Sequence, residues 1–396
     1  MAGIVEKGIE AIIKASGYFT SLIVLLIVLF LFREGISFLG SEPIEEGYAL
    51  YTSKSNPVQK VTATQIKDIF DQKILLWSEL GGSTDSIRRY ELDDLKSIFS
   101  ESELEKNFEN GASCVRKLTD SIPGSLILIP KAAIASEDGL HKVHTDKIDL
   151  TEFLSGKEWF PTAKPAGLFG SLPLFLGTLL VSLMAILIAL PFGMAGAIYL
   201  AEIADQKIRN ILKPLIELLS GIPSVVYGFF GLVVIVPWIQ KTLGLPVGES
   251  ALAGSIVLAI MALPTIITVS EDSIRTIPSD VRQASLALGA SQWQTIVRVL
   301  IPYAASGIGA AVILGIGRAM GETMAVLMVT GNAAVIPHGL AHPVRTIPAT
   351  IAAELGEAPY GGLHFKALFA LGCILFLITF ITNYIVDSIS RKRKLK

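Results

Sequence analysis

Two charged residues stand inside a strongly apolar stretch of this sequence. Arg318 and Glu322 are the only charged residues between Tyr303 and Arg345. A charge at the centre of a bilayer costs roughly 2.5–3.5 kcal/mol on insertion scales, so something must offset that cost. A spacing of four residues on one helix would place both side chains on the same face, where each could offset the other. The pair is either an ion pair that fixes helix packing or part of a pathway for an anion.

A second interruption lies in another apolar run, at Gly221-Ile-Pro-Ser224. Proline removes a helical N–H group and clashes with the preceding turn. Inside a membrane the freed carbonyl groups must find neighbouring donors or face a polar cavity. Ser224 and Tyr227 would then line a pathway, although a kink that only shapes the helix bundle fits equally well.

The elements that would position these residues are long apolar helices. The chain has 396 residues, of which 51% are hydrophobic and only 17% are charged, as expected for a membrane protein. About 20 apolar residues span a hydrocarbon core of roughly 30 Å. Six stretches meet this length: about Tyr18–Phe38, Leu172–Leu200, Leu215–Ile239, Ala251–Val269, Ala304–Val329 and Ala367–Val386. The sequence therefore predicts an all-α, multi-pass bundle of six transmembrane helices.

The distribution of basic residues predicts the orientation. Six spans place both termini on one side, and that side carries most of the bases: Lys7, Lys14, Lys207, Arg209, Lys213, Arg275, Arg282, Arg298 and the tail Arg391-Lys-Arg-Lys394 with Lys396. The positive-inside rule then makes both termini and the 271–302 loop cytoplasmic. The first span reads as an uncleaved anchor because no small-residue cleavage pattern follows it. The basic tail would lie on anionic membrane lipid.

The first two spans are separated by a long polar segment. Residues 41–165 hold 21 acidic and 15 basic residues, with turn signals and scattered apolar residues. Short amphipathic helices are predicted at Thr64–Phe70 and Leu92–Ile98, and a buried strand at Ser125–Pro130. We therefore expect three regions: an anchor at 1–39, a small α+β extracytoplasmic domain at 40–168, and a transmembrane domain at 169–396.

The 271–302 loop carries a motif of its own. Pro278 begins a short helix and Gly289 ends it, and the pattern QAS-x₃-G-x₉-V-x-I-P runs from Gln283 to Pro302. It resembles the "EAA" coupling loop of binding-protein-dependent ABC importer permeases of type I. The resemblance implies that this loop docks on a cytoplasmic ATPase subunit, and assigns the contact to Gln283, Ala284, Ser285, Gly289 and Ala290. The alternative is an ordinary interfacial helix.

From Phe153 onward the chain resembles the phosphate-specific ABC permeases of the PstC type. The matching residues are Phe153-Leu-Ser-Gly, Trp159, Pro161, Gly177-Thr178, Tyr199-Leu-Ala-Glu202, Gly221–Gly228, Ala284–Gly289 and Gly317–Thr323. The resemblance implies that the substrate is phosphate. We expect phosphate to contact Arg318 in transit, because the planar fork of donors suits its oxygens, and Glu322 to hold the guanidinium or to help release the anion. The implied partners are a second permease of the family, a dimer of cytoplasmic ATP-binding subunits and a periplasmic phosphate-binding protein.

Part of the polar domain resembles those phosphate-binding proteins. Asn56-Pro-Val, Thr62, Gln65–Phe70, Lys73-Ile, Trp77–Gly82 and Ile87 carry the likeness. Where that family has a serine- and glycine-rich anion loop, this chain has Glu91-Leu-Asp-Asp-Leu-Lys-Ser97. Three acids and no glycine give a poor anion cradle. We expect this domain to serve docking or gating, or to be a spacer.

Several function classes are not expected. There is no G-x₄-G-K-[ST], G-x-S-x-G or H-E-x-x-H pattern, so the chain should have no catalytic residues or ATPase site, and ATP with Mg²⁺ would bind the partner. No metal, cofactor or nucleic acid is expected. The alternatives are a permease for sulfate or molybdate, a membrane sensor that reads a ligand outside the cell, and a secondary transporter, for which paired interrupted helices are missing. The bacterial inner membrane is the expected location.

Overall fold

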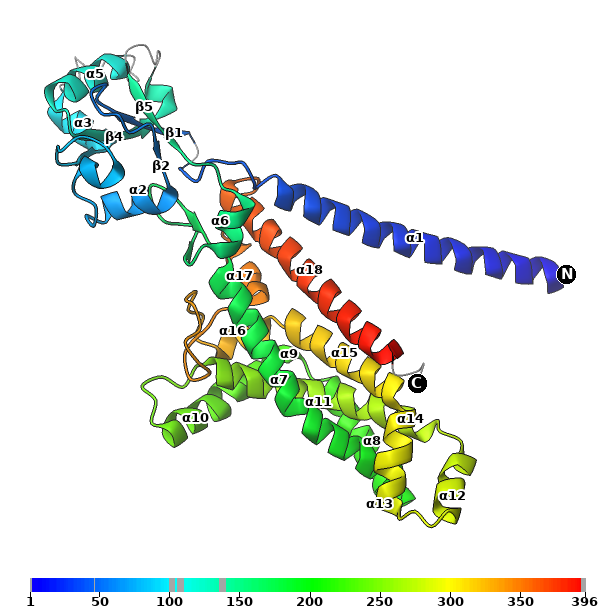
Figure 1. The fold of residues 1–396 in the computed structure, drawn as a ribbon. Coiled ribbons are helices and arrows are strands. Elements are labelled where there is room, and N and C mark those ends of the chain that lie inside the picture. Colours follow the sequence, from blue (N-terminus) through cyan, green and yellow to red (C-terminus); the bar gives the residue numbers. More distant parts are fainter. Residues whose placement is uncertain (1, 46, 100–103, 105–109, 135–139, 393–396) are drawn as a thin grey trace. The chain divides into compact units, whose positions relative to one another are not determined.

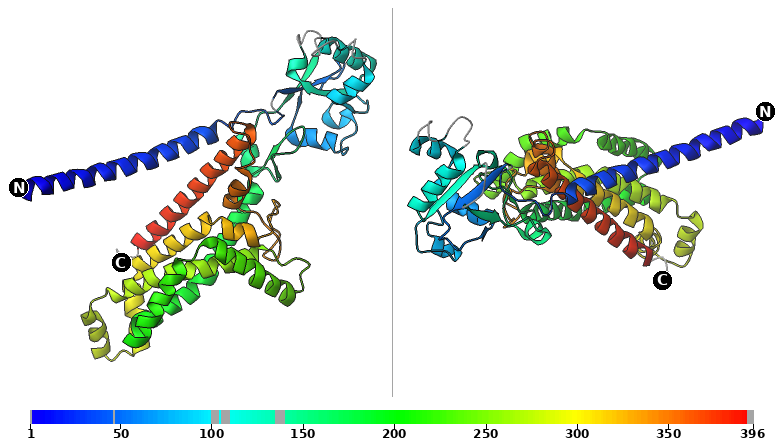
Figure 2. Two further views of the ribbon diagram at one scale, coloured as in Figure 1. Left: turned by 180° about the vertical axis from the view of Figure 1, so that it is seen from behind. Right: turned by 90° about the horizontal axis from the view of Figure 1, so that it is seen from above.

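The chain forms two compact units in a computed structural model, which describes residues 2–45, 47–99, 104, 110–134 and 140–392. One unit comprises residues 1–171 with 358–370, and the other residues 172–357 with 371–396. Residues 393–396 of the basic tail lie outside the described residues. Figures 1 and 2 show the helices and strands of each unit.

The first unit contains a long helix and a mixed sheet. Helix α1 (Ala2–Ile36) precedes the sheet, whose strand order is β2-β5-β1-β4-β3. The strands are β1 (Tyr48–Thr52), β2 (Lys60–Val61), β3 (Arg88–Tyr90), β4 (Ser125–Pro130) and β5 (His141–Thr145). The helices are α2 (Ala63–Phe70), α3 (Leu92–Ile98), α5 (Gly111–Ser121) and α6 (Leu150–Ser155), and a hairpin of β6 (Trp159–Phe160) and β7 (Leu168–Phe169) follows. Short 3₁₀ turns lie at Trp77–Leu80 and Lys131–Ala133.

Strand β4 explains how this sheet is held. Leu126 and Leu128 pack into one apolar cluster, with Ile66 and Trp77, whereas Ile127 packs into another. Because successive side chains of a strand point to opposite faces, the sheet is buried on both sides. The predicted strand at Ser125–Pro130 and the two predicted short helices are confirmed at these positions.

The second unit is helical. Its elements in chain order are α7 (Leu172–Ile198), a π-helix (Tyr199–Ile203), α8 (Gln206–Ser220), α9 (Ser224–Phe230), a π-helix (Gly231–Ile235), α10 (Val236–Leu243), α11 (Ala251–Arg275), α12 (Ser279–Ala287), α13 (Gln292–Thr295), a π-helix (Ile296–Leu300), α14 (Ile301–Tyr303), α15 (Ala305–Gly321), α16 (Met324–Val329) and α17 (Ile347–Glu354). Helix α18 (Leu363–Lys392) begins in the first unit and ends here.

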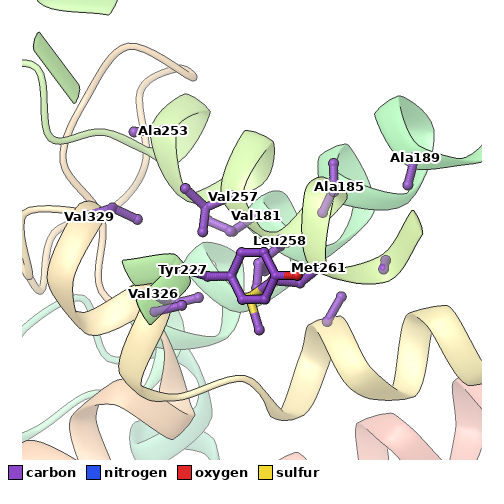
Figure 3. Close-up of a cluster of buried hydrophobic side chains, with 14 of the residues drawn as sticks. Val181, Ala185, Ala189, Tyr227, Ala253, Val257, Leu258, Met261, Val326 and Val329 are labelled. Atoms are coloured by element: carbon purple, nitrogen blue, oxygen red, sulfur yellow. The ribbon is translucent and has the colours of Figure 1, made fainter. Parts of the chain in front are cut away.

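Helices α7 and α11 form the centre of this unit, and α15 packs across them. Their close approach depends on small side chains: an added Cβ at Gly193 of α7 would lie 2.6 Å from Ile266 of α11. Figure 3 shows the ring of Tyr227 among Val257 and Leu258 of α11 and Val326 of α16. Helices α12 and α13 lie at one end of the unit, and α16 and α17 at the other (Figures 1 and 2).

Five helices are long and apolar enough to cross a membrane, by length and composition, among the described residues. They are Ile9–Ile36, Leu172–Ile203, Ser224–Leu243, Ala251–Arg275 and Leu363–Val386. The pair Gln292–Tyr303 and Ala305–Gly321, bent by 70°, makes a sixth if it is one span. The predominantly helical, multi-pass fold agrees with the prediction.

Two predicted spans had the wrong limits. The third was expected at Leu215–Ile239 with an interruption at Gly221–Ser224. The interruption is confirmed, because α8 ends at Ser220 and α9 begins at Ser224 after Pro223, but the candidate span is Ser224–Leu243. The fifth was expected to run unbroken through 304–329. It ends at Gly321, and Glu322 has extended backbone angles of φ −71° and ψ 133°.

Candidate functional site

Glu322 lies at a helix break rather than on a helical face. It follows the last residue of α15, and its carboxylate accepts a hydrogen bond from the backbone N–H of Ala325 at 3.3 Å. That bond satisfies one of the donors left free at the start of α16. The expectation that Glu322 and Arg318 share one helical face, four residues apart, is therefore wrong. The helix needed for that geometry has already ended.

The guanidinium of Arg318 is partly exposed in the last turn of α15. Within the described part of the chain it has no hydrogen bond and no ion pair with Glu322 or any other acid. An unpaired charge in an apolar helix is expensive unless water or a ligand reaches it. The chain therefore leaves all the donors of this arginine available.

The glycines around Arg318 divide into two sets. Gly307 and Gly315 pack against other helices, where an added Cβ would lie 2.1 Å from Ser273 and 3.2 Å from Ile266. Gly317 and Gly321 have no atom of the described chain within 4 Å of an added Cβ. The surface beside the arginine is therefore open at these two positions, and the packing glycines lie on the inner side of α15.

Tyr227 is nearly buried, with 7% of its surface exposed, and its hydroxyl donates to the Leu219 carbonyl at 2.7 Å. This bond bridges the break between α8 and α9 and satisfies a carbonyl near the end of α8. Ser224, by contrast, is the first residue of α9 and is only partly buried. Among the described residues, no hydrogen bond or ion pair joins either Tyr227 or Ser224 to Arg318.

Helix α12 carries the residues predicted for coupling. The helix begins after Pro278, and Gly289 follows it with φ of +84°, a left-handed conformation that favours glycine. The predicted limits of this short helix are confirmed. Gln283, Ala284 and Gly289 are exposed, while Ser285 and Ala290 are partly buried. The hydroxyls of Ser285 and Thr295 lie 2.9 Å apart, which ties α12 to α13.

The outer surface of this loop is unusually apolar for an exposed element. Leu288 is 89% exposed, and Leu286 and Trp293 are also exposed. The opposite side rests on a small apolar cluster that includes Ile274, Ile277 and Ile296. A loop with one face packed and one apolar face uncovered has the form of a docking surface.

Two ion-pair networks were missed from sequence. Arg282 of α12 pairs with Glu202, whose side chain is 5% exposed. Lys213 of α8 contacts Glu271 at 2.6 Å and Asp272 at 2.7 Å, and the Glu271 side chain is fully buried. Burial alone would lower the pKa of Lys213, but its hydrogen bonds to Asp272 and Glu271 raise that pKa above its ordinary value. The only sequence signal was an acidic residue at the end of an apolar run.

In the first unit, the start of α3 faces acids. The backbone N–H of Glu91 donates to the Asp94 carboxylate at 2.8 Å, and Asp93 lies in the first turn. The helix end therefore already holds a negative charge, which opposes an anion there. This geometry is consistent with the expected lack of an anion cradle at this position.

A family model for the binding-protein-dependent transport system inner membrane component matches residues 189–395. The chain belongs to this family. The matched region of this permease begins in α7 and includes α12, Arg318 and α18. It therefore contains every residue singled out in the second unit.

Curated relatives extend the match beyond the family region. The permease is 41% identical over 256 residues to the probable ABC transporter permease protein YqgH of Bacillus subtilis, covering 65% of this chain and 82% of the relative. It is 40% identical over 248 residues to the phosphate transport system permease protein PstC of Mesorhizobium japonicum, covering 58% and 75%. Among solved structures, the inward-facing MetNI methionine ABC transporter aligns with a TM-score of 0.43 at 21% identity, covering 57% of this chain and 94% of the other.

Proposed function

We propose that this permease is the membrane subunit of an ATP-driven importer of inorganic phosphate. The observation that carries the proposal is the unpaired Arg318 guanidinium, partly exposed where a membrane helix ends. Two of its curated relatives, at 40% and 33% identity, are named phosphate transport system permease proteins. The chain is a transport subunit, and a partner hydrolyses the ATP.

The assembly follows from the two surfaces of the second unit. A dimer of ATP-binding subunits, with ATP and Mg²⁺, docks on the exposed side of α12 at Gln283, Ala284 and Gly289. A second permease of the family covers the open face of α15 beside Gly317. A periplasmic phosphate-binding protein delivers the anion. Both termini and the 271–302 loop are then cytoplasmic, in accordance with the positive-inside rule.

The transport cycle uses one anion contact. Phosphate accepts two charge-assisted hydrogen bonds from the guanidinium of Arg318, in a bidentate arrangement. Glu322 caps α16 and places a negative charge near the anion, which favours release. Tyr227 and Ser224 border the same route. ATP binding favours one orientation of the site and hydrolysis the other, and only this bias makes uptake directional.

The region 40–168 serves docking or gating outside the cytoplasm in this proposal. The acids at the start of α3 support a role other than phosphate binding. The region 1–39 is an uncleaved anchor, and 169–396 is the transport domain.

The proposal is tested by ATP hydrolysis in the reconstituted complex. Phosphate delivered by its binding protein should stimulate hydrolysis at least tenfold, whereas sulfate should leave it at the basal rate. Stimulation by sulfate or molybdate instead would move the substrate to another oxyanion. A complex that responds to no solute would contradict the importer function.

A further inference from the structure

The coupling loop is joined to only some membrane helices by the chain itself. Helix α12 follows α11 after Thr276–Pro278 and leads through α13 and α14 into α15. Movement of α12 must therefore pull on α11 and α15. Helix α7 lies at the centre of the same unit but has no direct connection to this loop. The short routes from this loop to α7 are therefore non-covalent contacts, and they include the packing of α7 against α11.

Among the described residues, one ion pair links this loop to the end of α7, and it joins Arg282 and Glu202. Glu202 lies in the π-helix (Tyr199–Ile203) that extends α7, and Arg282 lies in α12, 80 residues later. The acid is 5% exposed and the base 34% exposed. A charged pair that is largely shielded from water is screened weakly. Its geometry is therefore held more firmly than that of a surface ion pair.

Three further hydrogen bonds hold the segment around Glu202. The side-chain amide of Gln292 donates to the Glu202 carbonyl at 3.3 Å. Arg209 donates to the Leu200 carbonyl at 2.8 Å and to the Ala201 carbonyl at 3.3 Å, which fixes the end of the π-helix. The Glu202 segment is thus braced on both sides of the ion pair. The other contacts on which movement could travel are apolar: α7 packs against α11, and Ala201 and Ile296 lie in one apolar cluster.

We propose that the Arg282–Glu202 pair is the joint that transmits movement of the coupling helix to the second membrane span. Apolar packing also transmits movement but is non-directional, whereas a shielded ion pair holds two particular groups together. When the ATP-binding subunits move α12, Arg282 draws Glu202 and the end of α7 with it. Both residues are positioning residues, and this role rests on the proposed transport function.

Charge exchange tests the joint. R282E and E202R each place like charges together, and the double variant R282E/E202R restores the attraction with reversed sign. R282K keeps the charge, and R298E is the matched control because Arg298 is exposed and close in sequence. Each single reversal should reduce phosphate imported per ATP at least tenfold, with the ATP-binding subunits still bound. The double variant should recover to within about threefold of wild type, and R282K and R298E should resemble wild type.

The distance between α12 and α7 tests the proposed joint without any substrate. Spin labels at S279C in α12 and F192C in α7, both exposed sites, are placed in a chain whose buried Cys114 and Cys373 are replaced by serine. In the complex without nucleotide, wild type should give one narrow distance distribution, which stays narrow when ATP binds. R282E should broaden it, and the double variant should narrow it again.

The outcomes separate this joint from the proposed function. A narrow distribution of spin-label distances in R282E would overturn the proposed joint. A double variant that imports as little phosphate per ATP as the single variants would overturn it too. Release of the ATP-binding subunits from R282E would also overturn it, because the pair would then serve docking. A wild-type complex that ignores phosphate would instead contradict the substrate, and the spin-label comparison would still decide the joint.

Discussion

Replacement of Arg318 separates a transport role from a structural one. Because its guanidinium has no hydrogen bond or ion pair within the described residues, R318Q leaves no orphaned partner behind. It also removes a charge whose place at a bilayer centre costs roughly 2.5–3.5 kcal/mol. The thermal stability of the complex should therefore stay the same or rise slightly.

Uptake should respond in the opposite way. A charge-assisted hydrogen bond contributes about 1.5–3 kcal/mol, so loss of two such bonds removes at least about 3 kcal/mol, or more than a hundredfold in rate. R318K keeps the charge without the planar fork and should retain an intermediate rate. The assay is uptake of labelled phosphate by proteoliposomes, with melting of the same samples as the control. Wild-type uptake by R318Q, or a melting temperature that falls in step with uptake, would refute the reasoning.

Four further changes have defined outcomes. E322A removes the carboxylate that caps α16 and should destabilise the protein by about 1 kcal/mol. E322Q keeps an acceptor oxygen, so it should melt like wild type while releasing phosphate more slowly. Equal melting temperatures of E322A and E322Q would contradict the capping role. Y227F loses the bond to the Leu219 carbonyl and should be about 1 kcal/mol less stable; an unchanged denaturation midpoint would be unexpected. G289A forces a left-handed alanine, which costs about 1–2 kcal/mol, and should weaken binding of the ATP-binding subunits; undiminished co-purification would argue against it. Burial, together with the negative charges of Asp146 and Asp149, raises the pKa of Glu152 above its ordinary value. The folded state therefore holds this proton more tightly than the unfolded state, and stability falls as pH rises above about 4.5. E152Q should melt at a higher temperature than wild type at pH 7 but not at pH 4, and a higher melting temperature at both pH values would exclude titration of Glu152 as the cause.

Much of the fold was readable from apolar patterning. Runs of about 20 apolar residues located the long helices, and a short apolar run identified the buried strand at Ser125–Pro130. The interruptions were harder. Pro223 revealed the break in the run Leu215–Ile239, but the sequence did not show that the apolar span begins only at Ser224. Glu322 follows Gly321 without any proline, and only the capping bond to Ala325 shows why the helix ends there.

Individual candidate residues could be chosen from the sequence, but their contacts could not. Arg318 stood out because an isolated charge is conspicuous in an apolar run. Its supposed partner Glu322 was chosen on the assumption of a continuous helix. The pair of Glu202 and Arg282 could not be found in this way, because the two residues are 80 positions apart and meet only after α7 and α12 pack. Contacts of this kind depend on tertiary structure and leave no local signal.

The most direct measurement is the structure of the assembled transporter trapped with phosphate inside the membrane. The account predicts phosphate oxygens about 2.8 Å from the guanidinium nitrogens of Arg318, in a passage that water can enter from one side. Phosphate bound elsewhere, with Arg318 sealed by side chains of a neighbouring subunit, would contradict it.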